Sequence, residues 1–522
     1  GVENWRGRRA LARWRQEQIA KGFPVDMAAV VPVPVPDQSN LVSAPLFRSL
    51  LDYSRGPTGI VWNEQAGQNH WSIITRERTR HRGKVPPEAK WFAGQHLDLA
   101  AWQAYYRQSF EAPKGTPGGF KKFALPQEVN IRYGIVPGTA QDDLPELPEF
   151  PVAPSRQTPA ADVLLALGKV GMDLDNIAAE ARARPLARFA VHYDERPAYG
   201  ILLPHLATSK KLILLAQLRA AARLANGEID GAAEDTALGM RLAENLRVEP
   251  FSISQKVRHT CWELALQPLW EGLVDHRWRE TDLARFEAAL RPVDFLAGFK
   301  LSCVGEQCFL SLVPEDNGGR KQLINAFASD SRAPESVERQ IGIWVSFCPH
   351  GWFLQNEVTR NRMIQEELEG FLQAAGTPAA TNFTRALEQP NYKNYHAKPY
   401  SFLANWMHDQ SWVHNLAAET LRAQTQLNLA RVAIALERYR LARGELPEAL
   451  RALAREYLDR VPTDLVGGED LHYARRPSGG FQLYSLGPNG RDDGGRAFNK
   501  KKPEDDDWAW PGPAGSMNQQ LQ

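Results

Sequence analysis

Residues 209–246, SKKLILLAQLRAAARLANGEIDGAAEDTALGMRLAENL, decide the fold class of this chain. Apolar residues recur at spacings of three and four on both sides of the segment 226–231, which is the pattern of helices that bury one face. Gly227 and Gly231 are expected to end the first helix, and Asp230 is expected to cap the second. The stretch therefore predicts an antiparallel helical hairpin, and because no second copy follows at a fixed period, a regular repeat array is not expected.

The same helical spacing continues away from this hairpin in both directions. Further helices are expected at 97–110, 161–174, 252–274, 281–290, 352–374 and 410–443. Residues 300–350 mix short apolar runs with turn residues, so loops with a short strand or two are expected there. Proline-rich stretches at 24–46 and 136–160 are expected to be extended spacers, because proline fixes φ and lacks an amide donor.

These patterns divide the 522 residues into four parts. Residues 1–46 form a basic N-terminal helix with a Pro-rich spacer, and residues 47–159 form a loop-rich aromatic strap that ends in a Pro-rich linker. Residues 160–410 form an irregular helical domain of helical hairpins, and residues 411–522 form a small α+β module. The predicted fold class is therefore mainly α, with a long helix packed on a short antiparallel sheet near the C-terminus.

Composition excludes several classes of protein. The chain has 62 Lys and Arg against 61 Asp and Glu, so bulk charge gives no reason to expect a nucleic-acid partner. No run of apolar residues is long enough to cross a membrane as a helix. The four cysteines lack the spacing of a zinc site. Cys303 and Cys308 either close a short disulfide loop or, like the other two, are small buried apolar residues.

The first 21 residues, GVENWRGRRALARWRQEQIAK, combine arginines with two tryptophans. Trp5, Leu11 and Trp14 can share one helical face while the arginines occupy the rest. Indole and guanidinium groups favour the membrane interface. The pattern favours a helix beside a membrane, with an anchoring segment upstream of Gly1; the other interpretation is a solvated amphipathic helix.

Beyond Gly444, which is expected to end the last long helix, the chain changes character. A short Pro-led helix is expected at 447–457, followed by strands at 471–475 and 481–486 around the turn Ser478-Gly479-Gly480. A long helix packed on such a hairpin is an α+β module.

The order of motifs in this module resembles the globular part of the major pseudopilin of type II secretion systems. The matching residues are Tyr439, Gly444, Leu446-Pro447, Val461-Pro462-Thr463-Asp464, Tyr473 and Tyr484-Ser485-Leu486-Gly487-Pro488-Asn489-Gly490. The resemblance covers residues 420–510. A pilus subunit is not expected, because residues 411–430 are too polar for the apolar stem helix of a pilin. Residues 3–9 (ENWRGRR) and 423–443 also resemble a family of membrane-anchored bacterial envelope proteins that end in this module.

The resemblance also implies calcium, which the corresponding loop of the pseudopilin binds. The ligands here would be Asp492, Asp493, Asp505 and Asp507, because calcium takes about six to eight oxygen ligands from carboxylates and carbonyls. The pseudopilin pattern is not matched residue by residue, since Asn489 stands where Asp is usual. The other interpretation is a solvated acidic tail that Lys500, Lys501 and Lys502 balance.

No motif of a hydrolase, a nucleotide-binding protein or a zinc protease is present. The sequence predicts a non-enzymatic, membrane-tethered envelope protein outside the cytoplasm that serves as a scaffold or accessory subunit for other envelope proteins. The alternative is an extracytoplasmic hydrolase with its site between the helical domain and the strap, and a third hypothesis is a secretion-system component. An enzyme requires ionisable groups in one pocket, and the first candidates are His192, His205, His350, His396 and His408.

Overall fold

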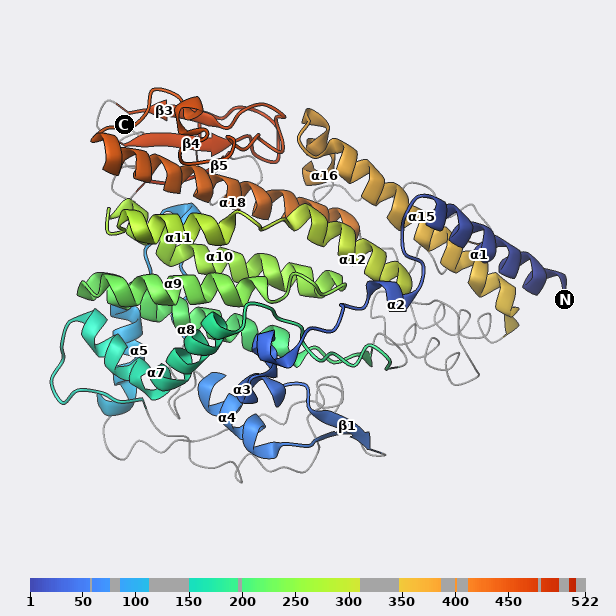
Figure 1. Ribbon diagram of the computed structural model, residues 1–522, viewed down its shortest axis with the longest axis horizontal. Helices are drawn as coiled ribbons and strands as arrows, with labels where there is room; N and C mark the ends of the chain where they lie inside the picture. The colour runs from blue at the N-terminus through green and yellow to red at the C-terminus, as the bar shows by residue number, and fades with distance from the viewer. Residues whose placement is uncertain are drawn as a thin grey trace.

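The computed structural model describes residues 1–56, 59–75, 85–111, 150–195, 200–309, 347–385, 400, 412–476, 480–496 and 507–512. These residues are mainly helical, with an N-terminal two-stranded hairpin and a three-stranded antiparallel sheet near the C-terminus (Figure 1). The predicted fold class, a mainly α protein with a small α+β module, is confirmed.

The hairpin that decides the fold consists of α8 (Pro204–Asn226) and α9 (Ile229–Glu244), packed side by side. Gly227 ends α8 with φ +82°, as predicted, but the same prediction for Gly231 was wrong, because Gly231 lies inside α9. The prediction for Asp230 was wrong, because Glu228 is the N-cap of α9 and the Asp230 carboxylate instead pairs with Arg279. A buried ion pair joins the two helices, with Arg219 Nε donating to Asp235 Oδ2 at 2.9 Å.

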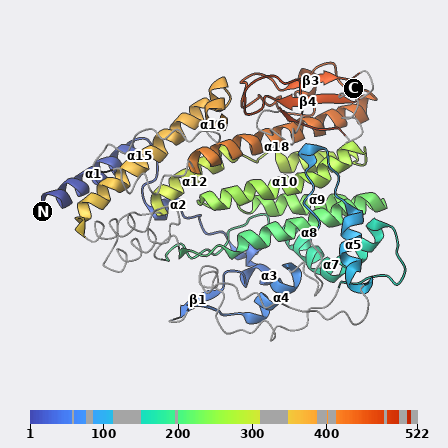
Figure 2. The ribbon, with the colours of Figure 1, turned by 180° about the vertical axis from the view of Figure 1, so that it is seen from behind.

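Helix α10 (Ser252–Val274) lies at the centre of the molecule. It contacts α8, α9, α12 (Phe295–Phe309) and α18 (Trp412–Arg443), and its buried residues face all sides of its axis. Outside this layer, α7 (Pro159–Ala183) packs on α8, α5 (Leu99–Glu111) packs on α7, and α11 (Glu280–Leu290) packs on α9 and α18. Figure 2 shows from behind that α5 and α7 lie on the far side of α8 from α10.

Helix α12 corrects the prediction of loops for residues 300–309. Its buried residues Phe295, Phe299 and Cys303 repeat every four positions, which is a helical period that the turn residues further along obscured. Residues 310–346 lie outside the described part of the chain. Cys303 and Cys308 are five positions apart on one helix, so they point to different sides. None of the four cysteines, all of which lie in the described ranges, is in a disulfide.

The strap follows the stretch 24–46, which was predicted to be an extended spacer. That spacer was predicted wrongly in part, because it contains the short turns α2 (Met27–Val30), η1 (Asp37–Ser39), η2 (Leu41–Ser43) and α3 (Pro45–Arg48). The strap continues through β1 (Tyr53–Gly56), β2 (Gly59–Trp62), α4 (Gln65–Thr75) and η3 (Trp91–Ala93) to α5. Its buried aromatic residues, including Tyr53, Trp71 and Trp91, belong to the same continuous core as the helices.

The C-terminal module packs α18 against a sheet of order β3-β4-β5, made of β3 (His472–Arg475), β4 (Phe481–Ser485) and β5 (Trp508–Ala509). The predicted hairpin is present, with His472 opposite Tyr484, whereas the helix predicted at 447–457 is only the 3-10 turn η8 (Leu450–Leu453). Gly444 ends α18 with φ +76°. Strand β5 was not predicted, because it is two residues long and its pairing partner β4 is more than twenty positions away.

The N-terminal helix α1 (Val2–Ala20) lies parallel to α15 (His350–Ala374), and the two project from the helical body (Figure 1). Asn4 accepts a hydrogen bond from Gly351 N at 2.8 Å, which satisfies one of the amides that the first turn of α15 leaves free. Lys21 pairs with Glu369 at 2.9 Å at the other end of the contact. The last described helical turns before α18 are η6 (Pro378–Ala380) and α16 (Thr381–Arg385).

Two glycines allow this close approach of α1 and α15. A Cβ added at Gly7 would lie 2.6 Å from Gly351 Cα, and one added at Gly351 would lie 2.6 Å from Asn4 Cα. Both neighbours are backbone atoms, which cannot rotate away. The helices therefore touch without intervening side chains at this point.

We predict that Gly7→Ala destabilises the packing of α1 on α15 by about 1–3 kcal/mol, because the added methyl group overlaps backbone. Hydrogen exchange of the α1 amides measures the effect. The matched control is Gly168→Ala in α7, where a Cβ meets nothing within 4 Å and alanine stabilises the helix by up to about 1 kcal/mol. Equal stabilisation by both substitutions would contradict the close contact.

Candidate functional site

The loop after β4 holds two of the predicted calcium ligands, Asp492 and Asp493. Asp492 Oδ1 accepts hydrogen bonds from Tyr484 Oη and from Gly494 N, both at 2.9 Å. Asp493 Oδ2 accepts one from Asn489 Nδ2, also at 2.9 Å. The loop is thus folded around its own carboxylates, and Asn489, the residue that departs from the pseudopilin pattern, acts as a donor within it.

Asp507 enters this loop from the end of the chain, directly before β5. Its Oδ2 accepts from Asp493 N at 3.0 Å and from Gly495 N at 2.8 Å. Its Oδ1 is buried and has no hydrogen-bond partner among the described residues. The pKa of Asp507 is raised to about 6, mainly by burial and also by the neighbouring charges of Asp493 and Asp492, while the backbone amides of Gly495 and Gly487 act to lower it.

Of the four predicted ligands, Asp492 and Asp493 therefore lie in this loop, and Asp507 binds the backbone of the loop, while Asp505 lies outside the described residues. Among the residues that are described, no group of three or more His, Cys, Asp or Glu side chains could hold one metal ion. One feature would suit calcium. Asp507 Oδ1 is buried without a hydrogen-bond partner among the described residues, and carboxylate and carbonyl oxygens are the ligands that calcium prefers. The sequence did not single out His472, whose Nδ1 lies 3.6 Å from Asp492 Oδ2.

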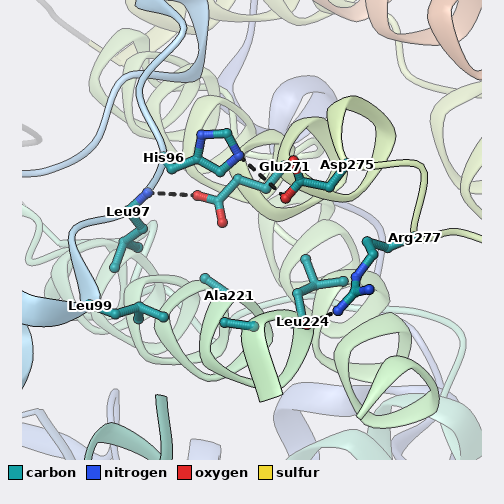
Figure 3. Close-up of a pocket in the computed structure, with 9 residues that line it drawn as sticks. His96, Leu97, Leu99, Ala221, Leu224, Glu271, Asp275 and Arg277 are labelled. Atoms are coloured by element: carbon teal, nitrogen blue, oxygen red, sulfur yellow. Dashed lines mark hydrogen bonds and ion pairs between the residues drawn. The ribbon is translucent and has the colours of Figure 1, made fainter. Parts of the chain in front are cut away.

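A second candidate site is a cavity of about 460 Å³ between the strap and the helices (Figure 3). His96, Leu97 and Leu99 line it from the strap, and α8 and the end of α10 line it from the helical body. Glu271 and Asp275 face it on the same side as His96, with Arg277 at its edge (Figure 3). The alternative hypothesis of a hydrolase places its site in this region, between the helical domain and the strap, and that hypothesis stays a prediction.

Glu271 is the buried acid of this cavity. Its Oε1 accepts from Leu97 N and from Gln267 Nε2, each at 2.8 Å, so it ties the strap backbone to α10. Burial raises the pKa of Glu271 above its usual range. His96 Nε2 lies 3.5 Å from Asp275 Oδ2 at the rim, and the His96 ring packs against Trp270 at 4.9 Å.

The histidines chosen from the sequence do not gather in this cavity. His192 stacks on Tyr53 at 4.3 Å, His205 is buried with its Nε2 2.7 Å from Glu249 Oε1, and His350 begins α15. His396 and His408 lie outside the described residues. The group that does form is His96 with Glu271 and Asp275. It has no local motif, because His96 is about 175 positions from the two acids and meets them only through the fold.

No protein-family model, curated protein or solved structure matches this chain. No helix within the described ranges is long and apolar enough to span a membrane.

We predict that calcium raises the melting temperature of the protein relative to EGTA at neutral pH, because a ligand that binds only the native state stabilises it by about 2.7 kcal/mol at a hundredfold excess over Kd. Asp507→Asn should abolish the shift, whereas Asp470→Asn, an exposed carboxyl of the same module, should leave it intact. An unchanged shift in Asp507→Asn would contradict a role for this oxygen.

The pH dependence follows from the raised pKa of Asp507, about 6 in the folded protein against about 3.9 when unfolded. In EGTA, protonation favours the native state, so this group contributes stability as the pH falls from 7 toward 4. Protons and calcium compete for the same carboxylate, so the calcium shift should be full above pH 7 and lost as the pH falls through about 6. Melts across this range test both signs.

At the second site, we predict that Glu271→Ala destabilises the protein by about 1–3 kcal/mol, because Leu97 N loses its acceptor and Gln267 loses one of its two. Glu271→Gln keeps an acceptor oxygen and should cost much less at neutral pH. Denaturant unfolding of the two variants measures the difference. Equal losses would show that the contact to the strap is not what Glu271 provides.

Proposed function

We propose that the protein is a non-enzymatic scaffold or accessory protein of the bacterial envelope, tethered to a membrane near its N-terminus and exposed outside the cytoplasm. The observation that carries the proposal is the placement of its ends. The arm formed by α1 and α15 projects at one end of the long axis, and the C-terminal module lies toward the other (Figures 1 and 2). A protein held by this arm presents its module away from the membrane.

The contacts between the C-terminal module and the helical body support a body that acts as a rigid spacer between the arm and the module. The residues after β5 return to the body, where Trp510 packs against Trp91 at 5.1 Å and Pro511 O accepts from Trp270 Nε1 at 2.9 Å. The module is therefore fixed to α10 and to the strap. Its strand β3 lies at the edge of the described sheet with Ala474 and Arg475 exposed, which suits contact with another envelope protein.

Cell fractionation tests the proposal on the full-length protein in its bacterial host. We expect the protein to sediment with membranes, and a tag after Gln522 to be degraded by external protease only once the outer layer of the envelope is made permeable. A photo-cross-linker at Ala474 should give a discrete protein adduct that one at the exposed Met172 of α7 does not. Recovery of the protein in the cytosol would contradict the proposal.

The cavity beside the strap favours a hydrolase as the second candidate. A histidine beside a carboxylate is suited to accept a proton from water, and a buried acid with a raised pKa is suited to protonate a leaving group. His96 with Asp275 and Glu271 would take these two roles.

A panel of chromogenic esters, phosphates and glycosides tests this second candidate. Any activity found should be lost in His96→Gln. It should be kept in the matched control His70→Gln, which alters another exposed histidine beside a carboxylate, Asp173 at 2.9 Å. Activity that survives His96→Gln, or no activity on any substrate of the panel, would reject a hydrolase at this cavity.

A further inference from the structure

The two faces of α1 carry different charges. Its acidic residues contact other parts of the same protein. Glu3 accepts hydrogen bonds from Gln355 of α15 and from Tyr400, and Glu17 pairs with Arg362 of α15 at 3.3 Å. The face that packs on α15 is completed by Gly7, Trp14 and Gln18, which are buried. The packing thus partly covers Glu3, whereas Glu17, whose side chain is 46% exposed, lies at the edge of the face that meets α15.

The outer face is basic and aromatic. The exposed arginines are Arg6, Arg8, Arg9, Arg13 and Arg15. Trp5 is 60% exposed, and Arg9 lies over its ring at 5.2 Å. At a helical rotation of about 100° per residue, Trp5, Arg9 and Arg13 point to one side of α1, opposite Gly7 and Trp14. Indole and guanidinium groups together favour the interface of a bilayer with anionic headgroups.

The end of the arm adds apolar groups to this face. Val2 is 75% exposed, and Phe347, three residues before α15, is 82% exposed. Because α1 and α15 run parallel and the Asn4–Gly351 hydrogen bond fixes their starts together, these two residues lie at the same end of the arm. The end therefore offers apolar side chains beside the arginines, which is the composition of a surface that rests in the headgroup region.

We infer that the outer face of α1, from Val2 to Arg15, together with Phe347, is a binding surface for an anionic phospholipid bilayer. This inference deepens the proposed membrane tether and rests on it for its setting, but it concerns this surface alone and needs no anchoring segment. The surface holds the arm against the bilayer and so sets how the body is oriented above it. Charge decides the occupant, because α1 exposes five arginines. Arg6 lies 3.9 Å from Glu3 and Arg15 lies 4.0 Å from Asp26, and the outer face keeps an excess of positive charge.

The test is co-sedimentation of the chain of residues 1–522 with vesicles. We expect binding to vesicles of equimolar phosphatidylcholine and phosphatidylglycerol, weak binding to phosphatidylcholine alone, and a loss of binding as salt is raised. The variant Arg8→Gln/Arg9→Gln/Arg13→Gln should bind about a hundredfold more weakly, because each basic residue near the surface contributes about 1 kcal/mol. The single substitution Trp5→Ala should also weaken binding, but without changing the salt dependence of binding.

The control variant Arg443→Gln/Arg451→Gln/Arg460→Gln makes the same change in net charge on the exposed surface of the C-terminal module and should bind normally. Unchanged melting temperatures show that both triple variants fold. Equal loss in the two variants, equal binding to both vesicle types, or tighter binding to duplex DNA than to anionic vesicles would each overturn the inference. If the full-length protein sediments with cell membranes but residues 1–522 do not bind vesicles, the lipid-binding surface is refuted and the tether stands. If residues 1–522 bind anionic vesicles but the full-length protein does not sediment with membranes, only the tether is refuted.

Discussion

Burial of α10 on every side along residues 264–273 is the constraint on which the rest of the structure depends. Buried polar side chains of such a helix need partners inside the protein, because an unpaired buried group costs about 1–3 kcal/mol. Arg258 pairs with Glu244 of α9 at 2.9 Å, and Gln267 donates to Gln95 O and to Glu271, both at 2.8 Å. The strap thus supplies hydrogen-bond partners to buried polar groups of α10, in addition to burying its own aromatic residues.

The same requirement ties the strap and the C-terminal segment to α10. The indole of Trp270 donates to the backbone of Pro511, and Trp91 donates from the strap to Glu263 O on α10 at 3.2 Å. Segments that the sequence separates into three parts therefore share one core around one helix. The arm differs, because buried residues of its outer half, such as Trp14 and Trp352, are not part of that core. This division suits a body that acts as a spacer and an arm that contacts something else.

Local patterns predicted the parts of the structure that local physics determines. The α8–α9 hairpin, α18 and the β3–β4 hairpin follow from periodicity and from glycines at their ends, and the loop with Asp492 and Asp493 was found from its motif. Long-range contacts determine the rest: β5 forms only against β4, and Glu271 becomes a site residue only where the strap reaches it. Asp507 was named with three other acids, but only the fold shows that its Oδ1 is the buried oxygen left without a partner among the described residues.

Native-state hydrogen exchange tests most directly whether strap, α10 and C-terminal segment form one unit that separates the arm from the module. The amides of residues 95–99 and 508–510 should exchange as slowly as those of α10 and open together with them, because Glu271 and Trp270 join all three. Fast exchange of either segment while α10 stays protected would contradict the account. It would show that the strap or the module opens as a separate domain, and that the body cannot act as a rigid spacer.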